Sequence, residues 1–190
     1  HTNYCWCKYG NWNAFNIRDK TMSGSLIKIN QTIASGNPST LTVTGITSDF
    51  DVFMVDVVNL VPNASGRVEW RITKGGSIQT DSEYDNARKD MPANASFQNN
   101  ENVNDSKVTN ATVDASGSWN AKFHLFNFTN ASEYSFGTFE HTAYVDSPQA
   151  FGGAGGFIHT VASASDGLSF HWGDSRTFNS GELHLYGLKK

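Results

Sequence analysis

Apolar and polar residues alternate in short segments along most of this chain. Leu168, Phe170 and Trp172 occupy every second position near the C-terminus, and Leu183 and Leu185 repeat the pattern after a turn-rich bridge. A period of two places these apolar side chains on one face of an extended strand. Gly, Asn, Asp and Ser interrupt the strand patterns about every eight to twelve residues, which is the spacing of a β-sandwich or barrel. The pattern therefore predicts an all-β fold.

The strand patterns assign most of the chain to one domain. Expected strands cover residues 25–33, 39–44, 51–60, 67–74, 108–113, 119–127, 135–144, 156–162, 167–172 and 181–186. We predict an antiparallel two-sheet β-sandwich of jelly-roll-like architecture over residues 25–190, preceded by an N-terminal arm over residues 1–24. The length of 190 residues suits a single sandwich core.

Three segments lack the strand pattern. Residues 83–91 predict a helix of one or two turns, which Pro92 would end. Residues 93–107 are polar and rich in Asn, which predicts a long exposed loop. The glycine-rich residues 151–157 predict a second, flexible loop. Long loops on a rigid sandwich are where binding residues tend to lie.

Some predicted strands carry more apolar surface than one thin sandwich needs. Val68, Trp70 and Ile72 alternate with polar residues, so this strand should bury one face and expose the other. By contrast, residues 52–61 are nearly all apolar, and residues 123–128 are similar. We expect the second sheet to cover these strands on one side and a neighbouring subunit or segment to cover them on the other. This surplus of apolar surface favours an oligomer.

The end of the chain also carries a family resemblance. Residues 166–170 read Asp-Gly-Leu-Ser-Phe, and residues 180–189 read Ser-Gly-Glu-Leu-His-Leu-Tyr-Gly-Leu-Lys. This ending resembles that of the C-terminal β-sandwich domain of tailed-bacteriophage virion proteins, which include tail, tail-fibre and head-associated structural proteins. From about Leu41 onward the order of elements is also similar to that of the family. Residues 1 to about 40 match no pattern of the family.

The resemblance implies a function as well as a fold. It implies a bacteriophage virion structural protein: a fibre, a spike, or a capsid or tail decoration subunit that contributes to particle assembly and to host-surface attachment. The expected partners are other virion proteins, further copies of the chain in a homo-oligomer, with a trimer as the copy number, and a host-surface glycan. The expected location is the virion, assembled in the host cytoplasm.

Composition narrows the list of partners. Charged residues make up 17% of the chain and the net charge is −4, so the basic stripe of a nucleic-acid-binding protein is missing. No run approaches the roughly 18 to 20 apolar residues of a membrane helix, so we expect no membrane insertion. The two cysteines, Cys5 and Cys7, are too close in sequence for an unstrained disulfide, and we expect reduced thiols. Since His1 is the first residue, we also expect processing or truncation of a longer chain.

The chain contains no motif that pairs a nucleophile with a base, so we expect no catalytic residues and no enzyme activity. Four histidines occupy outward strand positions in the predicted pattern: His124, His159, His171 and His184. Residues 81–86 are similar to a calcium loop, but Asn86 stands where the loop needs glycine and Pro92 where it needs glutamate. The glycines at 152–156 are not followed by the lysine of a phosphate loop. We therefore expect no cofactor and no metal.

The N-terminal arm is the most distinctive candidate for a binding segment. It contains five aromatic residues: Tyr4, Trp6, Tyr9, Trp12 and Phe15. No single period fits all five, so a simple core strand or helix does not account for them. Buried aromatic anchors supply much of the energy of protein interfaces. One hypothesis is that the arm docks onto another virion subunit or an adjacent protomer; the other is that it folds back over its own core.

Two further functions stay open. A carbohydrate-binding module or lectin outside a virion would show an aromatic platform, for which the candidates are Trp119, Tyr144 and Trp172. A glycan-degrading enzyme needs two carboxylates facing each other about 5 to 10 Å apart across a cleft. The candidates for such a pair, on different predicted strands, are Glu69, Glu140 and Glu182.

Overall fold

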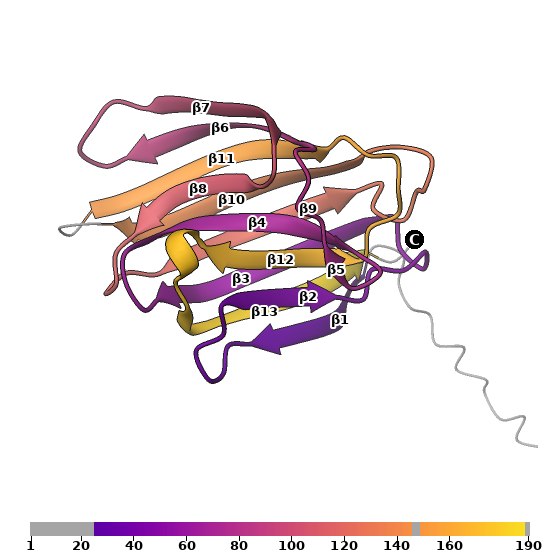
Figure 1. Ribbon diagram of the computed structural model, residues 1–190, viewed down its shortest axis with the longest axis horizontal. Helices are drawn as coiled ribbons and strands as arrows, with labels where there is room; N and C mark the ends of the chain where they lie inside the picture. Colours follow the sequence, from indigo (N-terminus) through magenta and orange to yellow (C-terminus); the bar gives the residue numbers. More distant parts are fainter. Residues whose placement is uncertain (1–24, 146–148, 189–190) are drawn as a thin grey trace, which may run out of the picture.

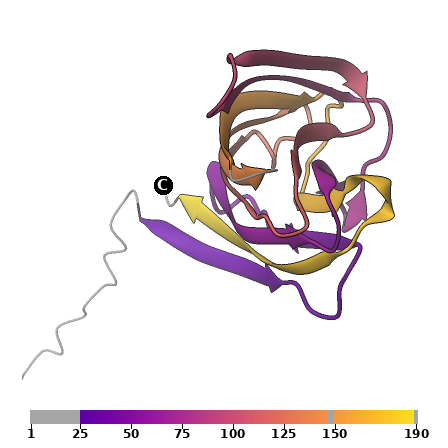
Figure 2. The same cartoon turned by 90° about the vertical axis from the view of Figure 1, so that its left-hand side faces the viewer.

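The computed structural model describes residues 25–145 and 149–188, and these residues form two antiparallel β-sheets. The large sheet contains, in spatial order, β1 (Leu26–Ile33), β13 (Phe178–Leu188), β3 (Val52–Pro62), β9 (Trp119–Phe126), β10 (Ser135–Val145), β11 (Gln149–His159), β6 (Tyr84–Pro92) and β7 (Gln98–Asp105). The small sheet contains β2 (Thr40–Thr44), β12 (Gly167–Trp172), β4 (Gly66–Lys74) and β5 (Ser77–Ile78), and β8 (Val108–Val113) also pairs with β4. Figures 1 and 2 show the two sheets as stacked layers. The predicted all-β, two-sheet antiparallel sandwich is confirmed.

A cluster of aromatic rings fills the space between the sheets. Trp70 on β4 contacts Phe123 and Phe139 of the large sheet edge-on, with ring centroids 5.2 and 4.9 Å apart. Trp119 stacks against Trp70 at 6.1 Å, and Phe170 of β12 completes the cluster. All five rings are at most 2% exposed, so the alternating pattern of the sequence correctly placed the core.

Residues Phe178–Leu188 form an interior strand of the large sheet. β13 pairs with β1 on one side and with β3 on the other. Two glycines of the closing motif allow close approach of neighbouring groups: a Cβ at Gly187 would overlap the Phe50 ring, and one at Gly181 would overlap Leu60. Gly181 also has a φ of 144°, which disfavours any residue with a side chain. The packing of this strand therefore requires both glycines of the motif.

The predicted helix at residues 83–91 is wrong, because these residues form strand β6. Its inward side chains are Tyr84, Asn86, Arg88 and Asp90, and its outward ones include Ala87 and Met91. The usual pattern is inverted here: the inward positions are mostly polar, and they concealed the period of two. Pro92 ends the strand, as it was expected to end the helix.

The two predicted loops also form strands. Within residues 93–107, β7 pairs with β6 as the edge strand of the large sheet. The glycine-rich segment belongs to β11, which begins at Gln149, ends at His159 and pairs with β10 and β6. Glycine is compatible with this strand because the His141 ring and the Arg88 side chain occupy the space that side chains at Gly153 and Gly155 would need.

Candidate functional site

Strand register aligns a row of apolar side chains across the outer face of the large sheet, the face turned away from the small sheet. Residues paired directly across neighbouring antiparallel strands point to the same face. The members of this apolar row, from β1 to β11, are Leu26, Leu188, Val52, Phe126, Phe136 and Ile158. Phe126 and Phe136 are adjacent in the row, and their side chains are 38% and 36% exposed. A contiguous apolar row on a sheet face is typical of an interaction surface.

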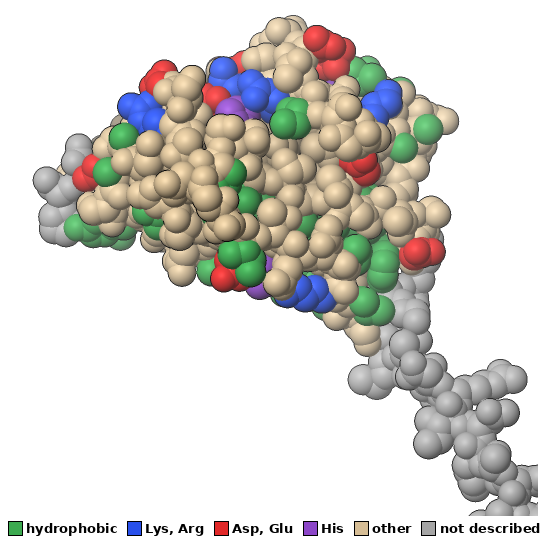
Figure 3. Space-filling model, turned by 60° about the horizontal axis from the view of Figure 1, so that its bottom comes forward, with side chains coloured by type: hydrophobic (Ala, Val, Ile, Leu, Met, Phe, Trp, Pro, Cys, Tyr) green, Lys and Arg blue, Asp and Glu red, His purple; other side chains and the backbone are tan. Residues whose placement is uncertain are grey.

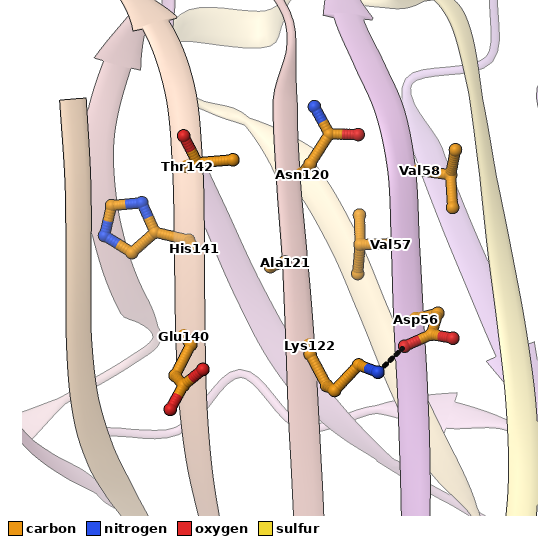
Figure 4. A pocket seen from close by; sticks show the side chains of 9 residues that line it. All are labelled: Asp56, Val57, Val58, Asn120, Ala121, Lys122, Glu140, His141 and Thr142. Carbon is orange, nitrogen blue, oxygen red and sulfur yellow. Dashed lines mark ion pairs between the residues drawn. The ribbon is translucent and has the colours of Figure 1, made fainter. Parts of the chain in front are cut away.

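A charged row crosses the same face four residues away along the strands. It contains His184, Asp56, Lys122, Glu140, Ala154 and Lys89, in the order β13, β3, β9, β10, β11 and β6. The Lys122 side chain extends toward Asp56, with 3.5 Å between Nζ and Oδ1, and away from Glu140 (Figure 4). Lys122 is half exposed, so this ion pair contributes at most about 1 kcal/mol to stability.

The charged row borders an open pocket of about 660 Å³ on β3, β9 and β10. Its polar groups come from exposed or half-buried side chains such as Lys122, Glu140 and Asn120. Across the parts of the chain that the structure describes, no group of three or more His, Cys, Asp or Glu side chains is placed to hold a metal ion. Val58 and Ala121 line the pocket as well, so it offers both apolar and polar groups to a contacting surface.

A second recess, the inter-sheet cleft, lies where strands β6 and β7 face β8. It has a volume of about 430 Å³ and is lined mainly by polar side chains, including Arg88, Asp90, Asn100, Asn102 and Asn110, with Phe151 as an aromatic member. Sequence reasoning missed this cleft because its strands were interpreted as a helix and a loop. The signal was present: opposite charges two residues apart on a strand, such as Arg88 and Asp90, share one face.

Arg88 and Asp90 form a buried ion pair in the lining of the inter-sheet cleft. Arg88 Nε donates to both carboxylate oxygens, at 2.9 and 3.1 Å, and the two side chains are 9% and 5% exposed. Arg88 also donates to the Thr109 carbonyl, and Asn100 Nδ2 donates to Asp90 Oδ2 at 2.6 Å. Buried charges need this degree of pairing, because an unpaired one would lose several kcal/mol of hydration.

Two histidines lie on the inner faces of the strands. His141, with a fully buried side chain, stacks on Phe151 and has Asp90 Oδ1 4.0 Å from its Nε2. Burial lowers the pKa of His141 to about 4, although Asp90 opposes the shift. His159 is 1% exposed beside Tyr84, so its predicted outward position is wrong. Burial lowers the pKa of His159 as well, with Glu83 acting in the other direction.

Three more histidines of the described residues point outward, as the alternation predicted. His124 is exposed on β9, and His184 lies 2.8 Å from Glu182 on β13. On the outer face of the small sheet, His171 Nε2 lies 2.6 Å from the Arg71 guanidinium and 2.9 Å from Glu69.

The three candidate carboxylates of a glycosidase are spread over both sheets. Glu69 lies on β4 of the small sheet, whereas Glu140 and Glu182 lie on β10 and β13 of the large sheet. Strands β10 and β13 are separated by β9 and β3, which places them about 14 Å apart at ordinary strand spacing. This exceeds the separation of a glycosidase pair.

The candidate aromatic platform is not assembled either. Trp119 and Trp172 are 0% and 3% exposed and belong to the core, and only Tyr144 is accessible, at 43%. The predicted docking residues Tyr4, Trp6, Tyr9, Trp12 and Phe15 lie outside the described residues, as do Cys5 and Cys7.

A scan against protein-family models and searches of curated proteins and of solved structures gave no match for this chain. The described residues contain no helix with the length and apolar character needed to cross a membrane. Charged side chains on the face in Figure 3 are scattered, without a patch of one sign. The fold defines this chain as a two-sheet β-sandwich. The outer face of its large sheet carries an apolar row and a charged row, and a polar cleft lies between the two sheets.

Proposed function

We propose that this chain is a structural subunit of a tailed-bacteriophage particle: a fibre, a spike, or a capsid or tail decoration subunit. The apolar row across the large sheet is the single observation that carries the proposal. It runs over six neighbouring strands, from Leu26 to Ile158, on a face that no other element covers among the described residues. The resemblance of residues 180–189 to the end of phage virion sandwiches supports the same role.

The occupant that we propose for this face is a second copy of the chain. Signs alternate along the charged row, from Asp56 to Lys122 to Glu140 and on to Lys89. A facing copy can place its lysines opposite these carboxylates while the apolar rows pack together. The face is therefore compatible with itself in both charge and apolar character. A face that packs against its own copy forms a pair, so the three copies that the family resemblance implies would need a further contact.

The aromatic residues of the N-terminal arm are a second proposed contact. Residue 25 leads directly into Leu26, the first member of the apolar row. Deletion of residues 1–15 distinguishes the two hypotheses for the arm. Loss of incorporation into particles with an unchanged melting temperature supports docking, whereas loss of the fold indicates an arm that covers its own core.

Electron microscopy of intact particles tests the proposed location. Particles of a phage that encodes this chain are incubated with a gold-labelled antibody raised against the purified protein, and pre-immune serum is the control. We expect gold at fixed positions on the tail or the capsid. Unlabelled particles, with all of the antigen in the soluble fraction of the lysate, would contradict a virion role.

A saccharide-binding module is the second candidate function, and one observation favours it. The inter-sheet cleft between β7 and β8 combines fixed polar groups with an aromatic wall. Host-surface attachment by a virion subunit would use the same kind of site.

A further inference from the structure

The inter-sheet cleft has the chemistry of a ligand site, independently of any role in a particle. It opens between the edge strand of the large sheet, β7, and strand β8 of the small sheet. Its volume of about 430 Å³ lies within the range of small-molecule pockets. The interior of a sandwich at this position would ordinarily be apolar, so a polar cleft here calls for a reason of its own.

The polar groups of the cleft are held in fixed positions. Asp90 accepts hydrogen bonds from Arg88 and from Asn100, and the Thr109 carbonyl holds the far end of the Arg88 guanidinium. These groups belong to three different strands, β6, β7 and β8. A site whose polar groups are oriented before binding avoids the entropy cost of ordering them.

One buried donor of the cleft has no partner among the residues that the structure describes. Asn110 is 1% exposed; its Oδ1 accepts from the Ala111 amide, but its Nδ2 has no hydrogen-bond partner within residues 25–145 and 149–188. An unsatisfied buried donor destabilises the fold, so most such groups in proteins find a partner. A ligand hydroxyl that reaches Asn110 would recover part of this free energy. Asn102, half-buried on β7, lines the same cleft.

The apolar wall of the cleft is an aromatic ring that packs against a buried one. Phe151 lines it, and the buried His141 ring stacks on Phe151 with centroids 5.7 Å apart and planes at 28°. An aromatic ring fixed in this way offers a flat apolar surface beside the polar groups, and this combination fits a ligand with one apolar face and a hydroxylated rim.

Charge balance restricts the class of ligand. The charged side chains whose strand positions face the cleft are Arg88 and Asp90, and they pair with each other. Arg67 and Glu101 occupy exposed positions that alternate with the inward residues of β4 and β7. An anion would compete with Asp90 for Arg88, a cation would compete with Arg88 for Asp90, and an apolar molecule would leave the amides unsatisfied. Hydroxyl groups both donate and accept hydrogen bonds, so a neutral polyhydroxylated molecule satisfies all of these groups at once.

We infer that the inter-sheet cleft binds a neutral saccharide unit, with its hydroxyls on the Asn102 and Asn110 amides and the Arg88–Asp90 pair, and one ring face on Phe151. This inference rests on the saccharide-binding candidate proposed above and specifies its site and ligand class, and it holds or fails independently of the proposed role in a virion.

Binding to the full chain tests the inference directly. The probes are neutral oligosaccharides of glucose, galactose, mannose and N-acetylglucosamine, titrated by calorimetry and by two-dimensional NMR. We expect at least one series to bind and to shift the side-chain amide signals of Asn100, Asn102 and Asn110. Failure of every neutral probe at millimolar concentration, or stronger binding of sialylated or phosphorylated sugars, overturns the inference.

A matched pair of variants on β7 locates the binding site. Asn102→Ala removes an amide from the cleft, and we expect affinity to fall about fivefold or more. Asn99→Ala changes the same residue type on the exposed outer side of the strand, where Asn99 pairs with Lys89, and we expect wild-type affinity. Equal affinities for both variants, or NMR shifts confined to the outer face of the large sheet, would place the saccharide elsewhere and refute the cleft. The NMR titration of the wild-type chain locates the site even where a variant fails to fold.

Discussion

Trp70 of the small sheet meets Phe139 of the large sheet edge-on, with centroids 4.9 Å apart and ring planes at 77°. Edge-to-face pairs of this kind contribute beyond the apolar area that they bury. Phe139 also contacts Phe123, so its ring joins both layers of the sandwich.

Phe139→Ala is therefore expected to lower the free energy of unfolding by about 3 to 5 kcal/mol. Tyr144→Ala, on the same strand but 43% exposed, should change it by less than about 0.5 kcal/mol. Urea unfolding followed by tryptophan fluorescence measures both variants. Similar losses in the two would mean that the aromatic cluster does not hold the sheets together.

Acidification is expected to destabilise the protein through His141. Its pKa is lowered to about 4 in the folded chain, against 6.5 for an unperturbed histidine. Between these values the unfolded chain binds more protons than the folded one, so the stability is full above about pH 6.5 and is lost as the pH falls toward 4. The loss is at most roughly 3 kcal/mol.

Replacement of His141 isolates this contribution. His141→Phe keeps a stacking ring against Phe151 and removes the titration of residue 141, while His159 still titrates in both proteins. Urea midpoints at pH 7 and pH 4.5 should therefore differ less in the variant than in the wild type. An equal difference in both would assign the acid sensitivity to other groups.

The glycine-rich part of β11 offers a paired test of strand packing. A Cβ at Gly155 would lie 2.5 Å from the Ala87 carbonyl oxygen, whereas the nearest atom to a Cβ at Gly152 is 3.5 Å away. We expect Gly155→Ala to cost about 1 to 3 kcal/mol through overpacking and Gly152→Ala to be nearly neutral. Thermal melting of both variants checks this. A neutral Gly155→Ala would support the loop that the sequence predicted for this segment.

The sequence predicts the fold wherever apolar residues face inward. Strands β8 and β12 begin and end at the predicted residues, because turn residues flank both of them and β12 alternates apolar and polar residues. The apolar period of two does not predict β6 and β7, because most of their inward side chains are polar. These polar side chains pair with one another across strands. Pairing across strands leaves no periodic trace in a single sequence.

The apolar row and the inter-sheet cleft also differ in how far the sequence predicts them. The apolar row depends on strand register: Phe126 and Phe136 become neighbours only when β9 pairs with β10, ten residues apart along the chain. Apolar composition on β3 and β9 correctly indicated a second apolar face, but not its alignment. The inter-sheet cleft needed the correct assignment of β6 and β7 and stayed hidden.

Assembly through the outer face of the large sheet is the central claim, and the solution mass of the full chain tests it most directly. Light scattering at micromolar concentration should give a multiple of the 20.8 kDa chain mass. The double variant Phe126→Ser and Phe136→Ser should give a single copy with an unchanged circular dichroism spectrum. Tyr134→Ser, an exposed aromatic residue outside the apolar row, should assemble like the wild type. A wild-type mass of one copy, or assembly of the double variant, would contradict the account.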